Sequence, residues 1–172
     1  MVQKLQAAEA HWHILYTKPR FEKKVYSRLI EAGIDCYLPL HKTIKQWSDR
    51  RKWVEEPLFK SYLFVHTDMK NYYTILNTLG AVKFIHFGGE VATIRAKKIE
   101  EIKLLLSNFS DVEIVDMQDI APTDEVRVVA GPLQGMTGKA MQYKGKQVLA
   151  VEIEHIGQSM VVQLPLKYLE KV

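Results

Sequence analysis

The chain has little of what marks a membrane, disulfide-stabilised or disordered protein. No apolar stretch approaches the roughly 20 residues needed to cross a bilayer. The single cysteine, Cys36, allows neither an intramolecular disulfide nor a multi-thiolate zinc site. Charged residues or histidine interrupt every apolar run in the first fifteen residues, so we expect no secretory signal and a cytoplasmic protein. With 47% apolar and 26% charged residues in a chain of 172, the composition predicts one or two folded globular domains.

Residues that could carry chemistry form no catalytic pattern. The glycines at 131, 135 and 138 precede a predicted strand and no Gly-Lys-Ser/Thr, so they form neither a phosphate-binding loop nor a dinucleotide fingerprint. His11 and His13 have no cysteine or acid at metal-ligand spacing. We interpret Cys36 as a small buried residue. The sequence therefore predicts no catalytic residue, no metal and no cofactor, and we expect a protein that is not an enzyme.

Charge is distributed unevenly along the chain. Residues 1–110 hold 18 Lys and Arg against 11 Asp and Glu, a balance of +7, whereas residues 111–172 hold 6 against 9, a balance of −3. Four acids at 111, 113, 116 and 119 lie in a stretch without a basic residue, which predicts an acidic linker over 108–122. Only the basic front half is a candidate for binding a polyanion.

Residues 11–107 alternate between strand and helix patterns and predict a mixed α/β sheet domain with packed helices. Strands are expected at 12–17, 34–38 and 63–65, and at 82–87 and 91–94 around Gly88-Gly89. Helical spacing covers 20–32, 69–79 and 96–106, with Asp68 as a cap. Residues 41–56 carry two tryptophans and five Lys or Arg around Ser48-Asp49, which predicts a protruding hairpin.

The sequence pattern of residues 123–172 differs from that of residues 11–107. Short β-rich runs at 126–129, 136–143, 148–153, 160–164 and 168–172 are separated by glycine and proline turns. Five short strands bury an interior only by curling, so we expect a small five-stranded β-barrel. The fold class is therefore α+β, with an N-terminal domain at 11–107 and a C-terminal barrel at 123–172.

Two stretches resemble the NusG family of transcription elongation factors. Residues 126–138, VRVVAGPLQGMTG, are similar to the KOW motif, and its residues here are Gly131, Pro132, Leu133, Gly135 and Gly138. Residues 12–20, WHILYTKPR, and 56–65, EPLFKSYLFV, resemble the family's amino-terminal domain. Lys60-Ser61 stands where general members have Pro-Gly. Together with the Trp and Arg hairpin, this departure favours the specialised paralogs that control long polysaccharide or secondary-metabolite operons.

The resemblance implies that the N-terminal domain binds the clamp helices of RNA polymerase through an apolar surface and suppresses pausing or termination. The matching positions are Tyr16, Pro57, Leu58, Phe59, Tyr62 and Phe64. Core packing is an equally good interpretation of Phe64, because neighbouring strand residues alternate faces. The hydroxyls of Tyr16 and Tyr62 favour a partly hydrated interface over a dry core. These two residues are therefore the stronger candidates for the polymerase-binding surface.

Specialised paralogs also contact the nontemplate DNA strand of the transcription bubble. The matching basic residues are Lys18, Arg20, Lys24, Arg28, Arg50 and Arg51. Arg20, Lys24 and Arg28 are spaced by four and would form one stripe on a helix, although such rows are more often solvated faces. Trp47 and Trp53 of the hairpin can contact DNA or pin the hairpin to its own domain, and both alternatives stay open here.

The KOW domain of this family recruits the termination factor Rho or the ribosome, through a small-subunit protein. We expect an antiterminator that acts as a monomer and binds no membrane. The alternative is an RNA-binding or ribosome-associated KOW protein that does not bind polymerase.

Overall fold

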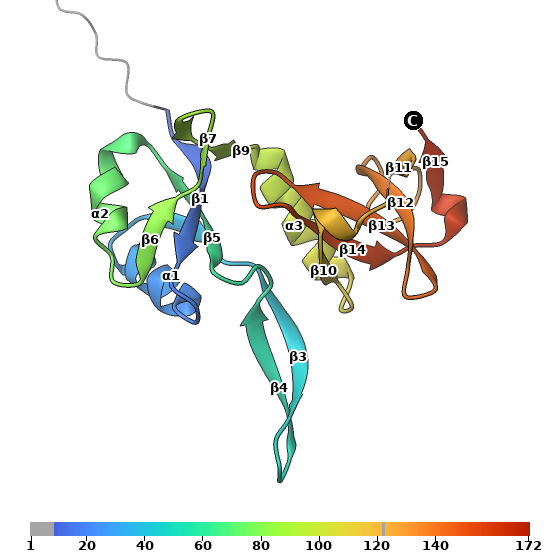
Figure 1. Ribbon diagram of the computed structural model, residues 1–172, viewed down its shortest axis with the longest axis horizontal. Coiled ribbons are helices and arrows are strands. Elements are labelled where there is room, and N and C mark those ends of the chain that lie inside the picture. Colours follow the sequence, from blue (N-terminus) through green and yellow to red (C-terminus); the bar gives the residue numbers. More distant parts are fainter. Residues whose placement is uncertain (1–8, 122) are drawn as a thin grey trace, which may run out of the picture. The chain divides into compact units, whose positions relative to one another are not determined.

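The computed structural model describes residues 9–121 and 123–172, which separate into two compact units (Figure 1). The first unit holds residues 9–38 and 59–96, and the second holds Pro39–Leu58 and Lys97–Val172. The predicted α+β class is confirmed, because helices and an antiparallel sheet make up the first unit and a larger antiparallel sheet occurs in the second. The boundaries 11–107, 108–122 and 123–172 stay predictions, and each unit is described by itself.

The sheet of the first unit is antiparallel, with strand order β2-β5-β1-β6, and β9 also pairs with β1. Its central pair, β1 and β5, is aligned so that Tyr16 lies opposite Tyr62 and Ile14 opposite Phe64. The strands expected at 12–17, 34–38 and 63–65 are present, whereas those expected at 82–87 and 91–94 are each broken into two short strands. Their bounds are β1 His11–Thr17, β2 Asp35–Tyr37, β5 Tyr62–Thr67, β6 Ala81–Phe84 and β9 Thr93–Ile94, and β7 His86–Phe87 and β8 Glu90–Val91 form the small Gly88-Gly89 hairpin.

Helices α1 (Glu22–Glu31) and α2 (Tyr72–Leu76) lie on the same side of this sheet (Figure 1). Helix α1 contributes the side chains of Val25 and Leu29 to the core, where both are fully buried. After its last residue the chain turns at Gly33, where the Gly33 N–H donates to Ile30 O and the Ile34 N–H donates to Leu29 O, both at 2.9 Å. Asp68 caps the short 3-10 helix η1 (Met69–Asn71) through the Lys70 N–H, which confirms its predicted capping role.

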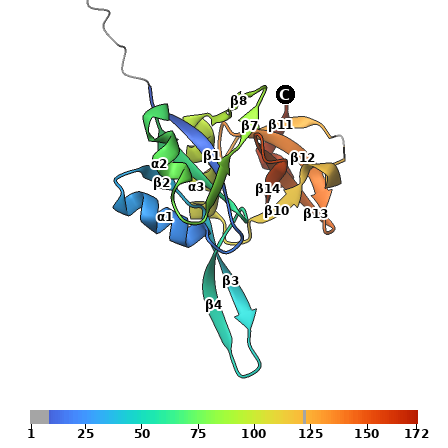
Figure 2. The same cartoon turned by 60° about the vertical axis from the view of Figure 1, so that its left-hand side comes forward.

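Residues 40–57 form the predicted hairpin, a two-stranded ribbon of β3 (Leu40–Gln46) and β4 (Arg51–Pro57) (Figure 2). The register pairs Ile44 with Trp53 and Gln46 with Arg51, and the turn is closed by the Trp47 N–H donating to Arg50 O at 2.8 Å.

The second unit also contains helix α3 (Ala96–Asn108, whose first residue belongs to the first unit) and a six-stranded antiparallel sheet of order β10-β14-β13-β12-β11-β15. The five C-terminal strands are found where the sequence predicts them. Their bounds are β11 Glu125–Val128, β12 Thr137–Tyr143, β13 Lys146–Ile153, β14 Gln158–Gln163 and β15 Leu169–Lys171, with the 3-10 helix η3 at Leu166–Tyr168. Met141, Val148, Ala150 and Val161 form a buried cluster on this sheet.

The acidic segment expected to be a linker contributes a strand to that sheet. Strand β10 (Glu113–Asp116) pairs with the edge of β14 and is followed by the 3-10 helix η2 (Met117–Asp119). Its charge misled the prediction because only Val115 of this strand is buried in the cluster, whereas the acids on either side of it, Glu113 and Asp116, are exposed. The Glu113 carboxylate accepts from Lys144 Nζ at 2.5 Å, and this hydrogen bond, more than any other cause, lowers the pKa of Glu113.

A buried carboxylate fixes the turn that leads into β5. The Tyr62 N–H donates to Phe59 O at 3.2 Å, which closes a four-residue turn with Lys60 and Ser61 at its centre. Ser61 has a φ of 66°, in the left-handed region that glycine adopts more readily. Its N–H donates to Glu22 Oε1 at 2.8 Å, and its carbonyl accepts from the Thr17 N–H at 2.8 Å. A central Pro-Gly pair suits such a turn by conformation alone, whereas Lys60-Ser61 depends on these bonds.

Replacing Ser61 with glycine should therefore stabilise the chain. Relief of the left-handed backbone is worth about 1–2 kcal/mol, and the greater freedom of glycine in the unfolded chain offsets about half of it. We expect the free energy of unfolding to rise by about 0.5–1 kcal/mol, measured by denaturant titration. The matched control is Lys60→Gly, whose native φ is not positive. If Ser61→Gly is as destabilising as the control, the turn is not strained.

Burial of the His13 imidazole should make the folded chain less stable at acid pH. It is 4% exposed, and its Nδ1 lies 3.0 Å from Ala92 O. Burial lowers its pKa from 6.5, so below that pH the unfolded chain takes up a proton that the folded chain resists. The free energy of unfolding should fall as the pH drops from 7.5 to 5.5, by at most about 1.4 kcal/mol per pH unit. His13→Gln should flatten this dependence, and the exposed His11→Gln should retain it. Equal slopes in both variants would contradict this origin.

Candidate functional site

One face of the first unit's sheet carries a series of aromatic rings. Residues that lie directly opposite in an antiparallel ladder share a face, so the registers of β1, β5 and β2 place six rings together. This aromatic face consists of Trp12, Tyr16, Tyr37, Tyr62, Phe64 and His66. The opposite face bears Leu15, Leu63 and Phe84, and the Phe84 ring stacks on Tyr72 of α2 with ring centroids 5.2 Å apart. The helices therefore cover the second face.

Tyr16 and Tyr62 form the exposed part of the predicted apolar surface. They lie opposite each other, are half-buried, and have ring centroids 5.5 Å apart. Burial, with a smaller contribution from the neighbouring Tyr16, raises the pKa of Tyr62, so its phenol stays protonated at neutral pH. The pair presents apolar ring surface together with hydroxyl groups at the solvent boundary, which is typical of residues at protein interfaces.

Three predicted surface residues belong to the core instead. Leu58 is 5% exposed, Phe59 1% and Phe64 0%, so none presents a usable side chain. Phe59 and Phe64 pack edge to face with ring centroids 6.1 Å apart. Strand β5 is buried on both faces, and simple alternation therefore fails for it. Pro57, at the end of β4, is half-buried.

Sequence reasoning missed Trp12, Tyr37 and His66 as members of the aromatic face. The Trp12 and His66 rings lie 5.0 Å apart, and the Tyr37 ring stacks on Phe64 at 6.4 Å. Trp12 lies four residues before Tyr16, so the two-residue period of a strand signals it. Tyr37 and His66 lie on this face through pairings between strands, which no local pattern specifies.

The predicted basic stripe is only partly present. Helix α1 begins at Glu22, so Arg20 precedes it, in a turn where its φ is 67°. Pro19 before Arg20 and the Phe21 N–H bond to Lys18 O explain this turn, which ends the strand before the helix starts. Arg28 Nη1 donates to Leu79 O at 2.7 Å and therefore holds the turn that follows α2. Lys18 and Lys24 are exposed, and Lys24 Nζ lies 5.0 Å from the Phe21 ring centroid.

The hairpin tryptophans are both largely exposed. Trp47 is 56% exposed and Trp53 65%. Arg50 and Arg51 are also exposed, and Arg51 Nε donates to Gln46 Oε1 at 3.0 Å. Both alternatives left open by the sequence, contact with DNA and packing on the domain, stay predictions.

The KOW-like residues connect β11 to β12. Gly131 and Gly135 have φ values of 81° and 88°, and the Gly135 N–H donates to Val128 O at 2.8 Å. Leu133 anchors the turn with 1% exposure. Gly138 serves a different purpose, because a Cβ there would lie 2.5 Å from Ala150 O of β13. Pro132 is exposed, and the motif thus reverses the chain as its residues predict.

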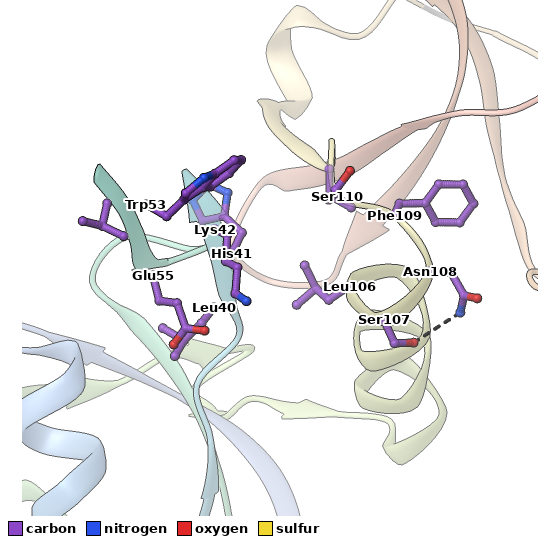
Figure 3. Close-up of a pocket in the computed structure, with 12 residues that line it drawn as sticks. Leu40, His41, Lys42, Trp53, Glu55, Leu106, Ser107, Asn108, Phe109 and Ser110 are labelled. Carbon is purple, nitrogen blue, oxygen red and sulfur yellow. Dashed lines mark hydrogen bonds between the residues drawn. The ribbon is translucent and has the colours of Figure 1, made fainter. Parts of the chain in front are cut away.

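A cavity of about 1040 Å³ occurs in the second unit (Figure 3). Hairpin residues that include Lys42 and Trp53 line it, together with Ser107 and Asn108 at the end of α3. The two polar side chains of α3 bond to each other at 3.2 Å. Among residues 9–121 and 123–172 no group of three or more His, Cys, Asp or Glu is placed to hold a metal ion. The buried Cys36 has a pKa raised to about 12 by burial, so its thiol is unreactive.

No helix in the described part of the chain has both the length and the apolar character to cross a bilayer. The exposed rings of the aromatic face have the chemistry of protein interfaces, and the exposed cations have the charge that attracts polyanions.

Comparison with known proteins assigns the chain to a family. A sequence model described as "Transcription termination factor nusG" matches residues 10–103. The structure is similar to that of NusG from Thermotoga maritima, solved in a study of its domain interaction, with a TM-score of 0.56 and 21% identity over 95% of this chain and 98% of that one. It also matches an MjSpt4:Spt5 complex with a TM-score of 0.33 and 18% identity, over 94% and 97% of the two chains. The matched family consists of transcription factors and not of enzymes. The chain belongs to the NusG family of transcription elongation and termination factors.

Proposed function

We propose that this chain is an operon-specific antiterminator, whose N-terminal domain (residues 11–107) binds the clamp helices of RNA polymerase through the aromatic face. The observation that carries this proposal is the Tyr16–Tyr62 pair, half-buried and side by side on paired strands. Family membership supports binding to RNA polymerase in general. The clamp helices as the docking element and the specialist role go beyond family membership and belong to the proposal.

The tyrosine pair suits a helical partner of mixed polarity. Each ring offers apolar area with only two rotatable side-chain bonds, so little conformational entropy is lost on binding. Each hydroxyl can exchange a water for a polar group of the partner. The family resemblance adds Pro57 to this proposed interface, whereas Phe59 and Phe64 support the tyrosine pair from the core of the first unit.

Contact with the nontemplate strand is assigned to the exposed cations. Lys18, Arg20 and Lys24 lie within seven residues of one another around the start of α1, and Arg50 and Arg51 lie on the hairpin. Arg28 contributes less, because its guanidinium is already bonded to Leu79 O. Such contacts fix orientation on a phosphate backbone and carry no sequence information themselves.

The C-terminal unit is assigned the recruiting role. We infer that the KOW-like barrel at 123–172, following a connector at 108–122, binds the ribosome through a small-subunit protein or binds Rho. Lys60-Ser61 and the tryptophan hairpin support a specialist that controls a long operon, such as one for a polysaccharide. The protein would act as a monomer beside polymerase in the cytoplasm.

Removing either tyrosine should weaken binding to isolated clamp helices. Tyr16→Ala and Tyr62→Ala in the full chain should each raise the Kd about 10-fold or more, measured by titration calorimetry. The matched control is Tyr73→Ala, because Tyr73 of α2 is 75% exposed and lies outside the aromatic face. Phe59→Ala is unsuitable, since emptying its buried site costs about 3–5 kcal/mol of stability. Unchanged affinity in both tyrosine variants would favour the alternative, a ribosome-associated protein that does not bind polymerase.

Reversing one charge beside α1 should change the salt dependence of binding to the transcription bubble. With Lys24→Glu, the slope of log K against log salt should become shallower by about 0.7 for each single-strand phosphate that is no longer neutralised. Lys167→Glu is the matched control, because Lys167 Nζ also lies over a neighbouring ring, Tyr168, but on the second unit. The same slope in the Lys24 variant and in the unmodified chain would show that Lys24 does not bind the strand.

A further inference from the structure

Strand β10 lies outside the five strands that the C-terminal residues form among themselves. In the sheet order β10-β14-β13-β12-β11-β15, the last five strands come from residues 125–171 and pair with one another without β10. Strand β10 pairs with β14 through four residue pairs, from Glu113 with Val161 to Asp116 with Gln158 (Figure 1). If β10 left, the other five strands would keep their pairing, and β14 would become the edge of the sheet.

The β14 edge lacks the features that keep a sheet edge from pairing with other chains. Proteins protect free edges with charged residues, proline, bulges or very short strands. Residues 158–163, QSMVVQ, contain no charge and no proline, and the four central residues are buried. The opposite edge differs, because β15 is three residues long and carries Glu170 and Lys171. The β14 edge therefore suits continuous cover by a further strand.

Few contacts hold β10 on this edge. Of its four residues only Val115 is buried, in the apolar cluster of the sheet. Glu113 accepts from Lys144 Nζ at 2.5 Å and from Tyr143 Oη at 3.2 Å. The side chains of this ion pair are 63% and 47% exposed, and exposed ion pairs contribute little stability. A strand held by one buried side chain and exposed polar contacts opens more readily than strands in a core.

The contacts of β10 also indicate which chemistry the β14 edge accepts. An acid at the position of Glu113 lies beside Lys144 and Lys146 at the β12–β13 turn. The hydrogen bond from Lys144 is the main cause that lowers the pKa of Glu113, and the charge of Lys146 contributes less. A β-branched residue at the position of Val115 fills the apolar cluster. A cavity of about 90 Å³, lined by Lys146 and Val161 among others, leaves room for a longer side chain than β10 provides.

We propose that β10 is a displaceable strand, and that the β14 edge beneath it binds an extended segment of a partner protein, with an acid at the position of Glu113 and a β-branched residue at that of Val115. The main chain of such a segment completes the sheet, and its alternate side chains supply specificity. The chain's own β10 competes at the high effective concentration of a tethered segment, so the edge is inhibited until another segment replaces it. This proposal deepens the recruiting role proposed for the C-terminal unit.

The test uses the full chain and a fluorescein-labelled peptide with the sequence of residues 111–118, DVEIVDMQ. The unmodified chain should bind this peptide weakly, because β10 occupies the edge. Val115→Asp in the chain places a charge in the apolar cluster, which should release β10 and lower the Kd for the peptide at least about 10-fold, measured by anisotropy. The matched control is Asp116→Asn, at an exposed position of the same strand, which should bind as the unmodified chain does. Equal affinity of the Val115→Asp chain and the unmodified chain would overturn the proposal.

Two further arms examine the chemistry of the bound segment. The same peptide carrying Val115→Asp should lose its binding to the Val115→Asp chain. Lys144→Gln, added to that chain, should weaken binding of the original peptide about 2- to 5-fold. Binding that depends on neither residue would contradict the assigned edge. Self-association of the Val115→Asp chain without peptide, measured by sedimentation, would assign the edge to a second copy and overturn the assignment to a partner protein.

Hydrogen exchange of the unmodified chain supplies a measurement that does not depend on how a variant folds. The amides of β10 should exchange at least about 10-fold faster than those of β13, which has a paired strand on both sides. Equal protection of the two strands would show that β10 is not displaceable. The peptide assay contains no polymerase, Rho or ribosome, so its failure and a failure of the proposed function are observed in separate experiments.

Discussion

The register of β1 against β5 is the constraint on which the first unit depends. Six consecutive pairs, from His11 with Thr67 to Tyr16 with Tyr62, decide which side chains lie under the helices and which form the aromatic face. A slip by one residue would exchange the two faces, exposing Leu15 and Leu63 and burying tyrosine hydroxyls beneath α1 and α2. Because both exchanges are unfavourable, the helical packing that stabilises the fold also fixes the position of the aromatic face.

The end of this ladder is set by polar contacts to α1. Glu22, in the first turn of the helix, accepts from the Ser61 N–H, and Ser61 in turn accepts from Thr17 at the end of β1. The turn before β5 and the turn before α1 both contain a non-glycine residue at positive φ, Ser61 and Arg20. These turns place an exposed cation, Lys18, two residues after Tyr16. The tyrosine pair proposed to bind polymerase and a cation proposed to bind DNA therefore belong to the same end of the β1–β5 pair.

The sequence predicts the helices and strands better than it predicts which side chains are exposed to solvent. Periodicity located α1, the hairpin and the five C-terminal strands, because each depends on local patterns and turn residues. It failed for Leu58 and Phe59 and left Phe64 undecided, because the burial of these residues depends on partners from distant strands and on cover over both faces of β5. The acids around Val115 obscured β10, and spacing by four placed Arg20 on a helix that starts two residues later. Tyr37 and His66 required the register between strands, which no local signal contains.

The central claim is that the aromatic face is the surface that meets RNA polymerase. Its most direct measurement is an NMR titration of the full chain, with labelled aromatic rings, against isolated clamp helices. The account predicts that the largest shift changes fall on the ring signals of Tyr16 and Tyr62, with smaller changes at Trp12 and Tyr37. Changes confined to Tyr73 and Phe87, which are exposed elsewhere on the unit, or to the C-terminal sheet would contradict it.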